Sequence, residues 1–490
     1  MGNLNQEVFK MARKTDEERE MILSAFDNQT TKSIIKNTKL KVEKALYEDK
    51  LLDKATELIC ESVKKIFDIY TTREDSKSEM WIYRGGIYIP KGRTYVREFA
   101  RKIFGRTYTD KRANLVIHKL EVDTYIDSDI FFGENNIDEI PVLNGILNLK
   151  TLELSDFSPD KIFFSKINAR YDPVAECPNI DKFITEILKK PEDKNIVYEI
   201  IGSGLRREYT IEKAVMCVGK GRNGKSKLLE LMKRFVGHDN CCAIPLSEMK
   251  SGSSAVCELH KRLFNLGGDL SNTDLKDTGL LKQSIGRDIL QAKRKFLTDL
   301  NFINYAKHVF AANELPRVYD MTDGFWTKWI LLEFPYKFVT KKEKRHSKSK
   351  VNLKEIDPHI IDKITTEEEL SGLLNKALEG LKRILENKDF SYTIGTSQIK
   401  DAWIRMSDSF KSFCLDRIEE SYSEIISKED LRKQYLYYCL EHKVKGASEI
   451  SIKITLEDLY GVTSAKRTIG NNRPYCWVGI KYKTNKVKVK

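Results

Sequence analysis

The chain has 490 residues, of which 41% are hydrophobic and 32% are charged. That length favours about three domains, and no apolar run is long enough to cross a bilayer, which argues against a membrane role. Lys and Arg outnumber Asp and Glu to give a net charge of +13, which favours a polyanionic partner such as nucleic acid. The nine cysteines form no CxxC pair, which excludes a zinc ribbon and predicts reduced, buried thiols.

The N-terminal segment is charged and lacks the apolar stretch of a signal peptide, so we expect a cytoplasmic protein. Apolar residues at helical spacing among Lys and Glu predict a helical region over 1–75. Short β-like runs punctuated by glycine follow, first WIYRGGIYIPKG and then IPVLNGILNLKT. These runs predict an α+β region over 76–195. Helical signals return after Pro178, where Asn179 is a plausible N-cap.

Between Ala214 and Phe338 short apolar strands alternate with helices, which predicts an α/β domain with a central sheet, placed at 196–395. This segment contains GKGRNGKS, a full match to the phosphate-binding pattern G-x-x-x-x-G-K-[ST]. An apolar strand precedes the loop and helical apolar spacing follows it, which is the order that the motif needs. The predicted nucleotide-binding residues are Gly219, Gly221, Asn223, Gly224, Lys225, Ser226 and Lys227.

Each residue type suggests a role in ATP chemistry. The glycines let backbone N–H groups converge on phosphate at a helix N-terminus. Lys225 is expected to reach the β- and γ-phosphates, and Ser226 is expected to hold Mg²⁺. Asp269 in KRLFNLGGDLS is the acid expected at the end of a neighbouring strand. We expect this one carboxylate both to hold the metal ion and to polarise the attacking water. Asn313 in KHVFAANELP would orient the attacking water, although an Asn in such a loop is ordinarily a turn residue.

Three further segments follow the predicted strands of this α/β domain. The sequence KFVTKKEKRHSKSK at 337–350 is typical of a solvated basic loop, and leucines from Leu370 to Leu385 define one apolar helix face. The region 396–490 begins with helices and ends in strand-like PYCWVGIKYK, an order compatible with a winged helix. The basic residues there that either contact DNA or belong to a charged solubilising end are Lys466, Arg467 and Arg473.

The motifs form a series: the phosphate loop, the strand with Asp269, LLKQSIGRDILQAKRKF, the strand with Asn313 and DGFWTKWILLEFP. Three other segments, NGILNL, YDPVAECP and LSGLLN, lie on either side of it. Together they resemble superfamily 3 helicases of the poxvirus, phage and plasmid primase–helicase type, and most of all the replication initiators of staphylococcal pathogenicity islands. The resemblance covers roughly Trp81 to Leu440 and is more specific than the phosphate loop alone.

This resemblance implies a homo-hexameric ring that binds ATP and Mg²⁺ between subunits and threads DNA through its centre. It also implies a basic hairpin that attracts the DNA backbone independently of sequence. The residues in that segment are Lys293, Arg294 and Lys295. Where the family commonly has arginines before its last motor strand, this chain has Thr327 and Lys328. The trans-acting cation is therefore expected to be Lys328 or Arg317, although a lysine lacks the bidentate fork that suits phosphate.

Related chains are often fused to a primase, and the triplet DSD at Asp127 to Asp129 could bind a metal ion. It lies in DTYIDSDIFF without a recognisable catalytic histidine partner, so we interpret it as a surface turn.

We therefore expect a multidomain α/β protein in which an AAA+-like P-loop ATPase core is flanked by an N-terminal helical and α+β region and a C-terminal winged-helix-like domain. The predicted function is an ATP-dependent DNA helicase that unwinds DNA at the replication origin of a mobile element, phage or virus. Two alternatives stay open: an ATP-regulated DNA-binding initiator without processive unwinding, and an ATP-driven protein remodeller. Host replication proteins are further candidate partners.

Overall fold

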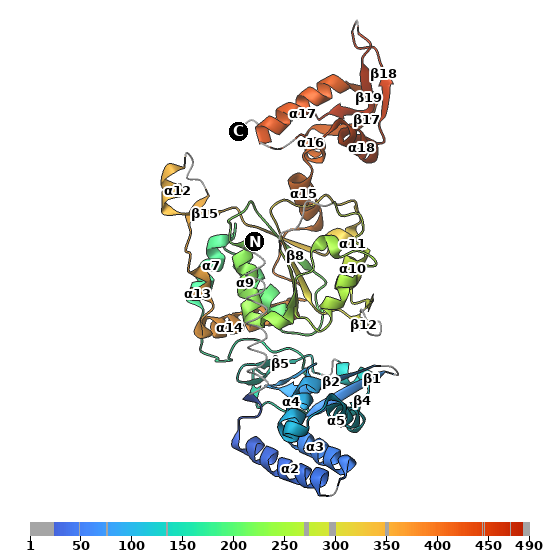
Figure 1. Cartoon of the computed structure of the whole chain (residues 1–490). Coiled ribbons are helices and arrows are strands. Elements are labelled where there is room, and N and C mark those ends of the chain that lie inside the picture. The colour runs from blue at the N-terminus through green and yellow to red at the C-terminus, as the bar shows by residue number, and fades with distance from the viewer. Residues whose placement is uncertain are drawn as a thin grey trace. The chain divides into compact units, whose positions relative to one another are not determined.

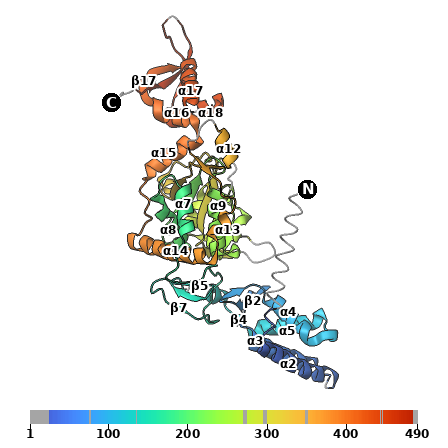
Figure 2. The same cartoon turned by 90° about the vertical axis from the view of Figure 1, so that its left-hand side faces the viewer.

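The computed structural model describes residues 24–48, 50–74, 77–133, 136–268, 274–293, 300–347, 352–442, 444, 446–470 and 472–483. These residues fall into two compact units, one that ends at Tyr171 and one that starts at Asp172. None of the helices among them is both long and apolar enough to cross a membrane. Figures 1 and 2 label the elements of both units.

The N-terminal unit packs helices against a small sheet. Its sheet has the order β3-β2-β1-β4, in which β1 and β2 form an antiparallel hairpin and β4 adds in parallel. The apolar faces of the helices and the inner face of this sheet share one buried core, which explains why neither forms a domain alone. The main elements are α2 (Gln29–Tyr47), α3 (Leu52–Ile66), β1 (Ile69–Glu74), β2 (Lys77–Arg84), β3 (Ile87–Ile89), α4 (Gly92–Phe104), α5 (Asp110–Asp123) and β4 (Tyr125–Ile126).

A three-stranded antiparallel meander completes this unit. Its strands are β5 (Glu139–Val142), β6 (Gly145–Asn148) and β7 (Leu154–Ser155). Between β4 and β5, the DSD triplet opens the short helix α6 (Ser128–Phe132), where the Asp127 carboxylate accepts a hydrogen bond from the Asp129 N–H at 2.8 Å. The triplet is thus a helix N-cap at the surface, in keeping with the interpretation as a turn.

The second unit is built on a five-stranded, fully parallel sheet with the order β14-β8-β13-β10-β9. If the five strands are numbered along the chain, the order is 5-1-4-3-2, so the first strand lies between the fifth and the fourth. The central sheet predicted for this region is therefore present. Helices α9 (Lys225–Val236) and α10 (Gly279–Ile285) lie on either side of the strands in Figure 1. The strands are β8 (Ala214–Val218), β9 (Cys241–Cys242), β10 (Phe264–Gly267), β13 (Lys307–Ala312) and β14 (Trp329–Glu333).

Three helices of this second unit pack on one another. The predicted apolar face of α14 (Glu367–Asn387) is buried and packs on α8 (Asp193–Ser203), with α7 (Pro178–Ile187) against both. At the crossing of α14 and α8, a Cβ built on Gly380 would lie 2.6 Å from the Tyr198 carbonyl oxygen. Glycine therefore permits a closer approach of these two helices than any other residue would.

The C-terminal part of this unit has the element order helix, strand, helix, helix, strand, strand. Its sheet is antiparallel with the order β17-β19-β18 and covers a core of its own. The elements are α16 (Ser409–Arg417), β17 (Ile418–Ser427), α17 (Lys428–His442), α18 (Glu449–Tyr460), β18 (Thr463–Lys466) and β19 (Tyr475–Tyr482).

The observed boundaries differ from the predicted ones at three points. A boundary at 75/76 would cut the β1–β2 hairpin, and one at 195/196 would separate α7 from the α8–α14 pair that it packs on. A boundary at 395/396 would separate α15 (Thr396–Ser407) from the domain with the five-stranded sheet, although Trp403 of α15 is fully buried in the core of that domain. At the second and third boundaries part of the packing partner lies far along the chain, in α14 for α7 and in the strands β8, β13 and β14 for α15, so local sequence carries no signal for it.

Candidate nucleotide-binding site

The phosphate-loop motif lies between the buried strand β8 and the helix α9. The loop leaves the sheet after Val218, and three of its residues have positive φ: +34° at Gly221, +56° at Arg222 and +93° at Gly224. A Cβ on Gly224 would lie 2.5 Å from a side-chain carbon of Ile187. Both the backbone conformation and this close packing therefore require glycine at position 224. A loop that turns in this way before a helix N-terminus directs N–H groups towards one point, as phosphate binding needs.

Lys225 is the first residue of α9, and its side chain is only 5% exposed. Its ammonium group donates hydrogen bonds to the carbonyl oxygen of Gly219 at 2.5 Å and to the Asn223 amide oxygen at 3.0 Å. A third bond, 3.1 Å long, runs to the amide oxygen of Asn313. The lysine is thus held inside the curve of the loop, where a phosphate anion would meet both its charge and the helix N-terminus.

Asn313 reaches this position because β13 is the parallel neighbour of β8. Parallel strands end at the same edge of a sheet, so the residue after Ala312 comes out beside the residue after Val218. The Gly219 N–H donates to the Ala312 carbonyl at 3.2 Å, and the Asn313 amide oxygen also accepts the Gly221 N–H at 3.2 Å. Asn313, predicted from the sequence to orient the attacking water, is therefore in direct contact with the phosphate loop.

The strand on the other side, β14, fixes the base of the loop. The Phe334 N–H donates to the Val218 carbonyl at 2.8 Å, and the Phe334 carbonyl accepts from the buried Asn223 side chain at 3.3 Å. A Cβ on Gly219 would lie only 2.3 Å from this same carbonyl oxygen. Asn223 therefore belongs to the framework of the loop, in addition to its contact with Lys225.

A further tether was not predicted from the sequence. The Arg222 guanidinium pairs with both carboxylate oxygens of Glu343, at 2.8 and 3.3 Å, and the Arg222 carbonyl accepts the Phe338 N–H at 2.7 Å. Glu343 lies in α12 (Lys341–His346), within the segment interpreted as a solvated loop. Hydrogen bonds from Arg222 and from the Thr340 backbone lower the pKa of Glu343 to about 2, so this pair stays charged at neutral pH. The segment is thus attached to the tip of the phosphate loop.

The remaining predicted nucleotide and metal ligands are only partly described. Ser226 and Lys227 are exposed in the first turn of α9. Asp269 lies outside the described residues, which resume at Asp274, and the last described residue after β10 is Gly268. Within the described ranges, no group of three or more His, Cys, Asp or Glu side chains is arranged to hold a metal ion. A hydroxyl beside a phosphate loop fits Mg²⁺ that is bound together with a nucleotide.

The two predicted trans-acting cations form ion pairs with residues outside the phosphate loop. Lys328 precedes β14, level with the start of β8 and hence at the opposite edge of the sheet, where it forms an ion pair with Glu212. Arg317 pairs with Asp408 at 3.5 Å and donates to the Ser451 hydroxyl at 3.2 Å. Neither residue takes part in the nucleotide site within one chain.

The predicted DNA contacts that the structure describes lie on or beside two β ribbons. Strands β11 (Ile289–Ala292) and β12 (Leu300–Ile303) pair in antiparallel fashion, and the exposed Lys293 follows β11. Arg294 and Lys295 lie outside the described residues. The second ribbon is β18–β19. It carries the exposed basic residues Lys466, Arg467 and Arg473.

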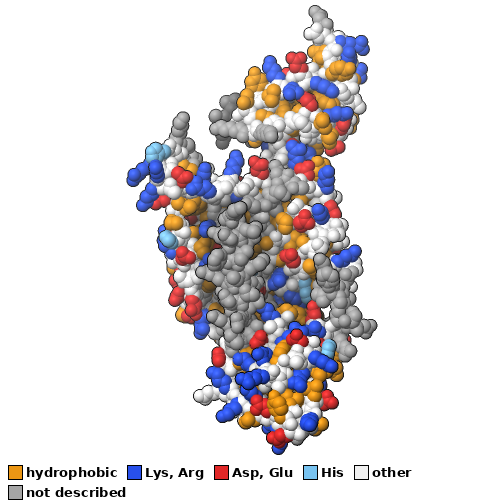
Figure 3. All heavy atoms as spheres, in the orientation of Figure 1, with side chains coloured by type: hydrophobic (Ala, Val, Ile, Leu, Met, Phe, Trp, Pro, Cys, Tyr) orange, Lys and Arg blue, Asp and Glu red, His pale blue; other side chains and the backbone are white. Residues whose placement is uncertain are grey.

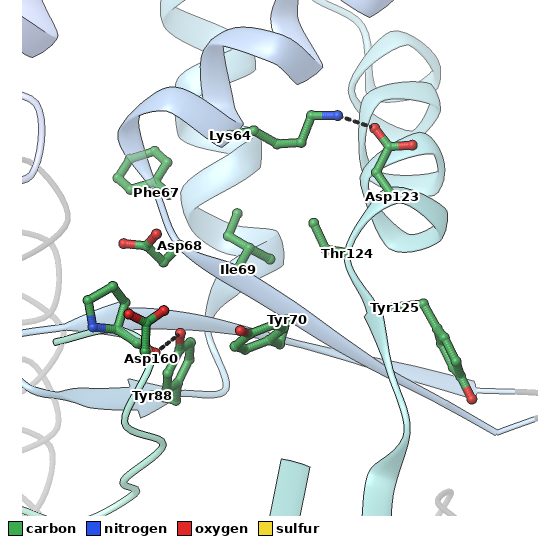
Figure 4. Close-up of a pocket in the computed structure, with 11 residues that line it drawn as sticks. Lys64, Phe67, Asp68, Ile69, Tyr70, Tyr88, Asp123, Thr124, Tyr125 and Asp160 are labelled. Carbon is green, nitrogen blue, oxygen red and sulfur yellow. Dashed lines mark hydrogen bonds and ion pairs between the residues drawn. The ribbon is translucent and has the colours of Figure 1, made fainter. Parts of the chain in front are cut away.

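A separate cavity of about 300 Å³ lies in the N-terminal unit (Figure 4). Its lining includes the carboxylates of Asp68, Asp123 and Asp160, against the single ammonium group of Lys64, which lies 2.6 Å from Asp123. The buried Tyr88 hydroxyl donates to the Pro159 carbonyl, and burial raises the pKa of Tyr88. Excess negative charge disfavours phosphate, so this cavity does not compete with the loop as a nucleotide site.

Two family models match parts of the chain. One is described as D5 N terminal like and matches residues 15–189; the other is described as a family of unknown function (DUF5906) and matches residues 217–324. The chain is also similar to a protein of Acanthamoeba polyphaga mimivirus described as a putative helicase, L207/L206, with 28% identity over 233 residues. That match covers 44% of this chain and 24% of the mimivirus protein, so it spans about a quarter of the relative's length.

Two solved structures share low sequence identity with the chain. The apo C-terminal region of NrS-1 is 13% identical with a TM-score of 0.42, covering 86% of this chain and 98% of that one. The JCV helicase is also 13% identical, with a TM-score of 0.26, and the match covers 54% of this chain and 64% of that one.

Proposed function

We propose that this protein is an ATP-dependent DNA helicase that unwinds DNA at the replication origin of a virus, phage or mobile element. The observation that carries the proposal is the contact between Lys225 and Asn313 at the carboxyl edge of the parallel sheet. A phosphate-loop lysine that holds the phosphates and a polar side chain from the neighbouring strand that orients the attacking water are two of the groups that ATP hydrolysis uses. The strand order with the first strand inside the sheet supports an AAA+-like motor.

In this mechanism the chain's own residues hold and orient the nucleotide. The N–H groups of the loop and the Lys225 ammonium bind the phosphates, and the Asn313 amide orients the attacking water. Asp269 takes up the proton of that water or positions it, and Ser226 would hold Mg²⁺, which when bound neutralises charge on the phosphates. The Lys225 ammonium has three donors and all three are hydrogen-bonded inside the loop, so a phosphate oxygen would replace at least one of these acceptors when the nucleotide enters.

The proposal includes a homo-hexameric ring, in which Lys328 or Arg317, both paired outside the phosphate loop of their own chain, would act on the nucleotide of a neighbouring subunit. In such a ring each subunit supplies a cation to the nucleotide of its neighbour. Lys293, which follows β11, and its sequence neighbours Arg294 and Lys295 would then contact the DNA backbone in the channel. The helix and strand order of 409–483 supports a winged-helix domain, whose β18–β19 ribbon would contact duplex DNA.

The comparisons support the same assignment at a coarser level. The D5 N terminal like match and the viral relative described as a putative helicase agree with a helicase of the viral primase–helicase type. The more specific parts of the proposal, namely ATP as the nucleotide, origin unwinding, the ring and a mobile-element source, rest on the residues and on the resemblance of the motif series.

Two other functions share the same nucleotide site. An initiator that uses ATP only to assemble on duplex DNA would hydrolyse ATP without strand displacement, and a protein remodeller would show no stimulation of its ATPase by DNA. Displacement of a labelled strand from forked DNA, measured together with the ATPase rate, separates all three. Helicase activity requires both ATP-dependent displacement and stimulation by DNA.

A further inference from the structure

A concentration of positive charge lies in the N-terminal unit, which contains none of the described residues assigned to DNA or nucleotide above. Between Lys91 and Arg112 the chain has eight Lys or Arg residues and only two acidic ones, Glu98 and Asp110. This stretch forms α4, the turn after it and the start of α5. Lys and Arg side chains gather on the face of this unit that is visible in Figure 3.

Helix α4 divides cleanly into two faces. Its apolar side chains, from Tyr95 to Phe104, are buried in the core of the unit. The exposed positions are all polar, and Arg93, Arg97 and Arg101 follow one another at intervals of four residues. Residues four apart share one side of a helix and lie about 6 Å apart along its axis, so the three arginines form a stripe.

Among the described residues, Arg93 is the member of this stripe that pairs with a carboxylate. Arg93 contacts the Glu121 carboxylate at 2.5 Å. Arg97 donates instead to the neutral amide oxygen of Asn114 on α5, at 3.3 Å, and the Arg101 guanidinium lies 5.6 Å from the centre of the Tyr108 ring. Their positive charges therefore remain available at the surface.

Four other cations lie in the last turn of α4, in the turn after it and at the start of α5. Lys102 lies over the Phe26 ring at 5.0 Å, and Arg112 lies near the Phe104 ring and donates to the Thr107 carbonyl at 2.7 Å. Arg106 and Lys111 are exposed, and none of these four cations is paired with a carboxylate among the described residues. We call the set the α4–α5 basic face; it comprises Arg97, Arg101, Lys102, Arg106, Lys111 and Arg112.

We propose that the α4–α5 basic face binds the phosphate backbone of DNA. Guanidinium groups match phosphate oxygens in a bidentate manner, and held beside neutral oxygens and aromatic rings they keep their charge for an anionic ligand. Four of the six cations are arginines. An arginine side chain binds phosphate oxygens better than a lysine side chain does, because the lysine ammonium is more strongly hydrated. The contact is independent of base sequence and depends on salt, because it releases counterions from DNA.

The chemistry of this face favours nucleic acid over an anionic membrane. A helix that binds a lipid surface inserts an apolar side into the headgroup region. The apolar side of α4 is already buried, and its exposed positions are Arg, Lys, Thr and Glu. A polyanion that needs no apolar insertion therefore fits this surface.

The test compares the full chain with the double variant Arg97→Glu/Arg101→Glu. The affinity for a labelled DNA of about 20 bases, single-stranded or duplex, is measured by fluorescence anisotropy. The titrations contain no ATP and span about 50 to 200 mM salt. We expect the variant to bind at least about tenfold more weakly at low salt, and the slope of log K against log salt to fall by about 2. The conservative variant Arg97→Lys/Arg101→Lys should retain most of the affinity.

The matched control is Lys39→Glu/Lys41→Glu, which makes the same change in charge at exposed positions of α2 in the same unit. Equal losses in both double variants, or an unchanged affinity in Arg97→Glu/Arg101→Glu, would overturn the proposal, as would binding to phosphatidylserine vesicles without binding to DNA. The ATPase rate without DNA should match the wild type in all of these variants. A failure here that leaves a Lys225-dependent ATPase intact contradicts the basic face alone and not the proposed motor.

Discussion

Lys225 and Asn313 are hydrogen-bonded directly, with 3.1 Å between the lysine Nζ and the asparagine Oδ1, although 88 residues separate them in the chain. The contact exists because β8 and β13 are parallel neighbours and end at one edge of the sheet. It joins the residue proposed to hold phosphate to the residue proposed to orient water.

This pair yields a prediction that separates binding from hydrolysis. Asn313→Ala removes the water-orienting amide but no charge, so we expect the ATPase kcat to fall by about 10²-fold while nucleotide affinity changes little. Asn313→Asp instead places a carboxylate against the phosphate site, so nucleotide affinity should fall by about tenfold or more. Steady-state ATPase assays and binding of a fluorescent nucleotide analogue measure both quantities. Equal affinities in the two variants would contradict this placement of Asn313.

The buried His308 makes the stability of the motor unit depend on pH. Its ring nitrogens contact the side chains of Asn265 at 3.2 Å and Ser284 at 3.0 Å, both neutral, and burial lowers the pKa of His308 to about 3. In the unfolded chain its pKa is near 6.5, so between about pH 6.5 and 3 the unfolded state binds the extra proton. The free energy of unfolding should therefore fall as the pH is lowered through this window, by up to about 1.4 kcal/mol per pH unit from this group.

Urea denaturation at several pH values measures that dependence in the wild type and in His308→Gln. The difference in free energy of unfolding between the two proteins should shrink as the pH falls below about 6.5. Parallel pH profiles would mean that His308 is not the titrating group.

Trp403 attaches α15 to the motor core. Its ring is fully buried, with its centroid 5.0 Å from that of Trp329, and its indole N–H donates to the Pro316 carbonyl at 2.9 Å. We expect Trp403→Ala to lower the free energy of unfolding by about 3–5 kcal/mol. Trp403→Phe, which keeps an aromatic ring but leaves the carbonyl unpaired, should cost about 1–3 kcal/mol. Chemical denaturation gives both values, and a smaller loss for Ala than for Phe would rule out this packing role.

The β18–β19 ribbon is proposed to contact duplex DNA. Lys466, whose ammonium lies 5.1 Å from the centre of the Tyr475 ring, and Arg467 are both exposed. Lys466→Glu/Arg467→Glu should weaken binding to duplex DNA by about tenfold and reduce the salt slope by about 2. Lys433→Glu, an exposed position on α17 of the same domain, serves as the control. Anisotropy titrations would contradict the proposal if the ribbon variant bound as tightly as this control.

The local features of the nucleotide site were predictable because they follow from short-range rules. The glycines of the loop, the apolar strand before it and the amphipathic helix after it lie within one continuous segment, so motif spacing and periodicity were enough. The apolar face around Leu370 to Leu385 was predictable for the same reason, although Ile384 is the buried residue at its end and Leu385 is only half-buried.

The features that escaped prediction depend on distant partners. The pair between Arg222 and Glu343 spans 121 residues, and a basic run such as KKEKRH resembles a solvated loop until its one acidic residue is seen to face the phosphate loop. The buried side of α15 was missed because Trp403 is a single aromatic residue on a short helix, and only the tertiary fold shows what covers it. The stripe formed by Arg97 and Arg101 is visible only once the buried face of α4 is known.

The most direct test of the proposed helicase is displacement of a labelled strand from forked DNA by the wild type and by Lys225→Ala, with and without ATP. The ATPase rate is measured in parallel, and the two proteins are compared in the same oligomeric state. Lys233→Ala, on the same helix, is the matched control. We predict ATP-dependent displacement by the wild type and the control, and loss of both displacement and hydrolysis in a folded Lys225→Ala protein. Undiminished hydrolysis in Lys225→Ala, or hydrolysis by the wild type without any displacement, would contradict the helicase.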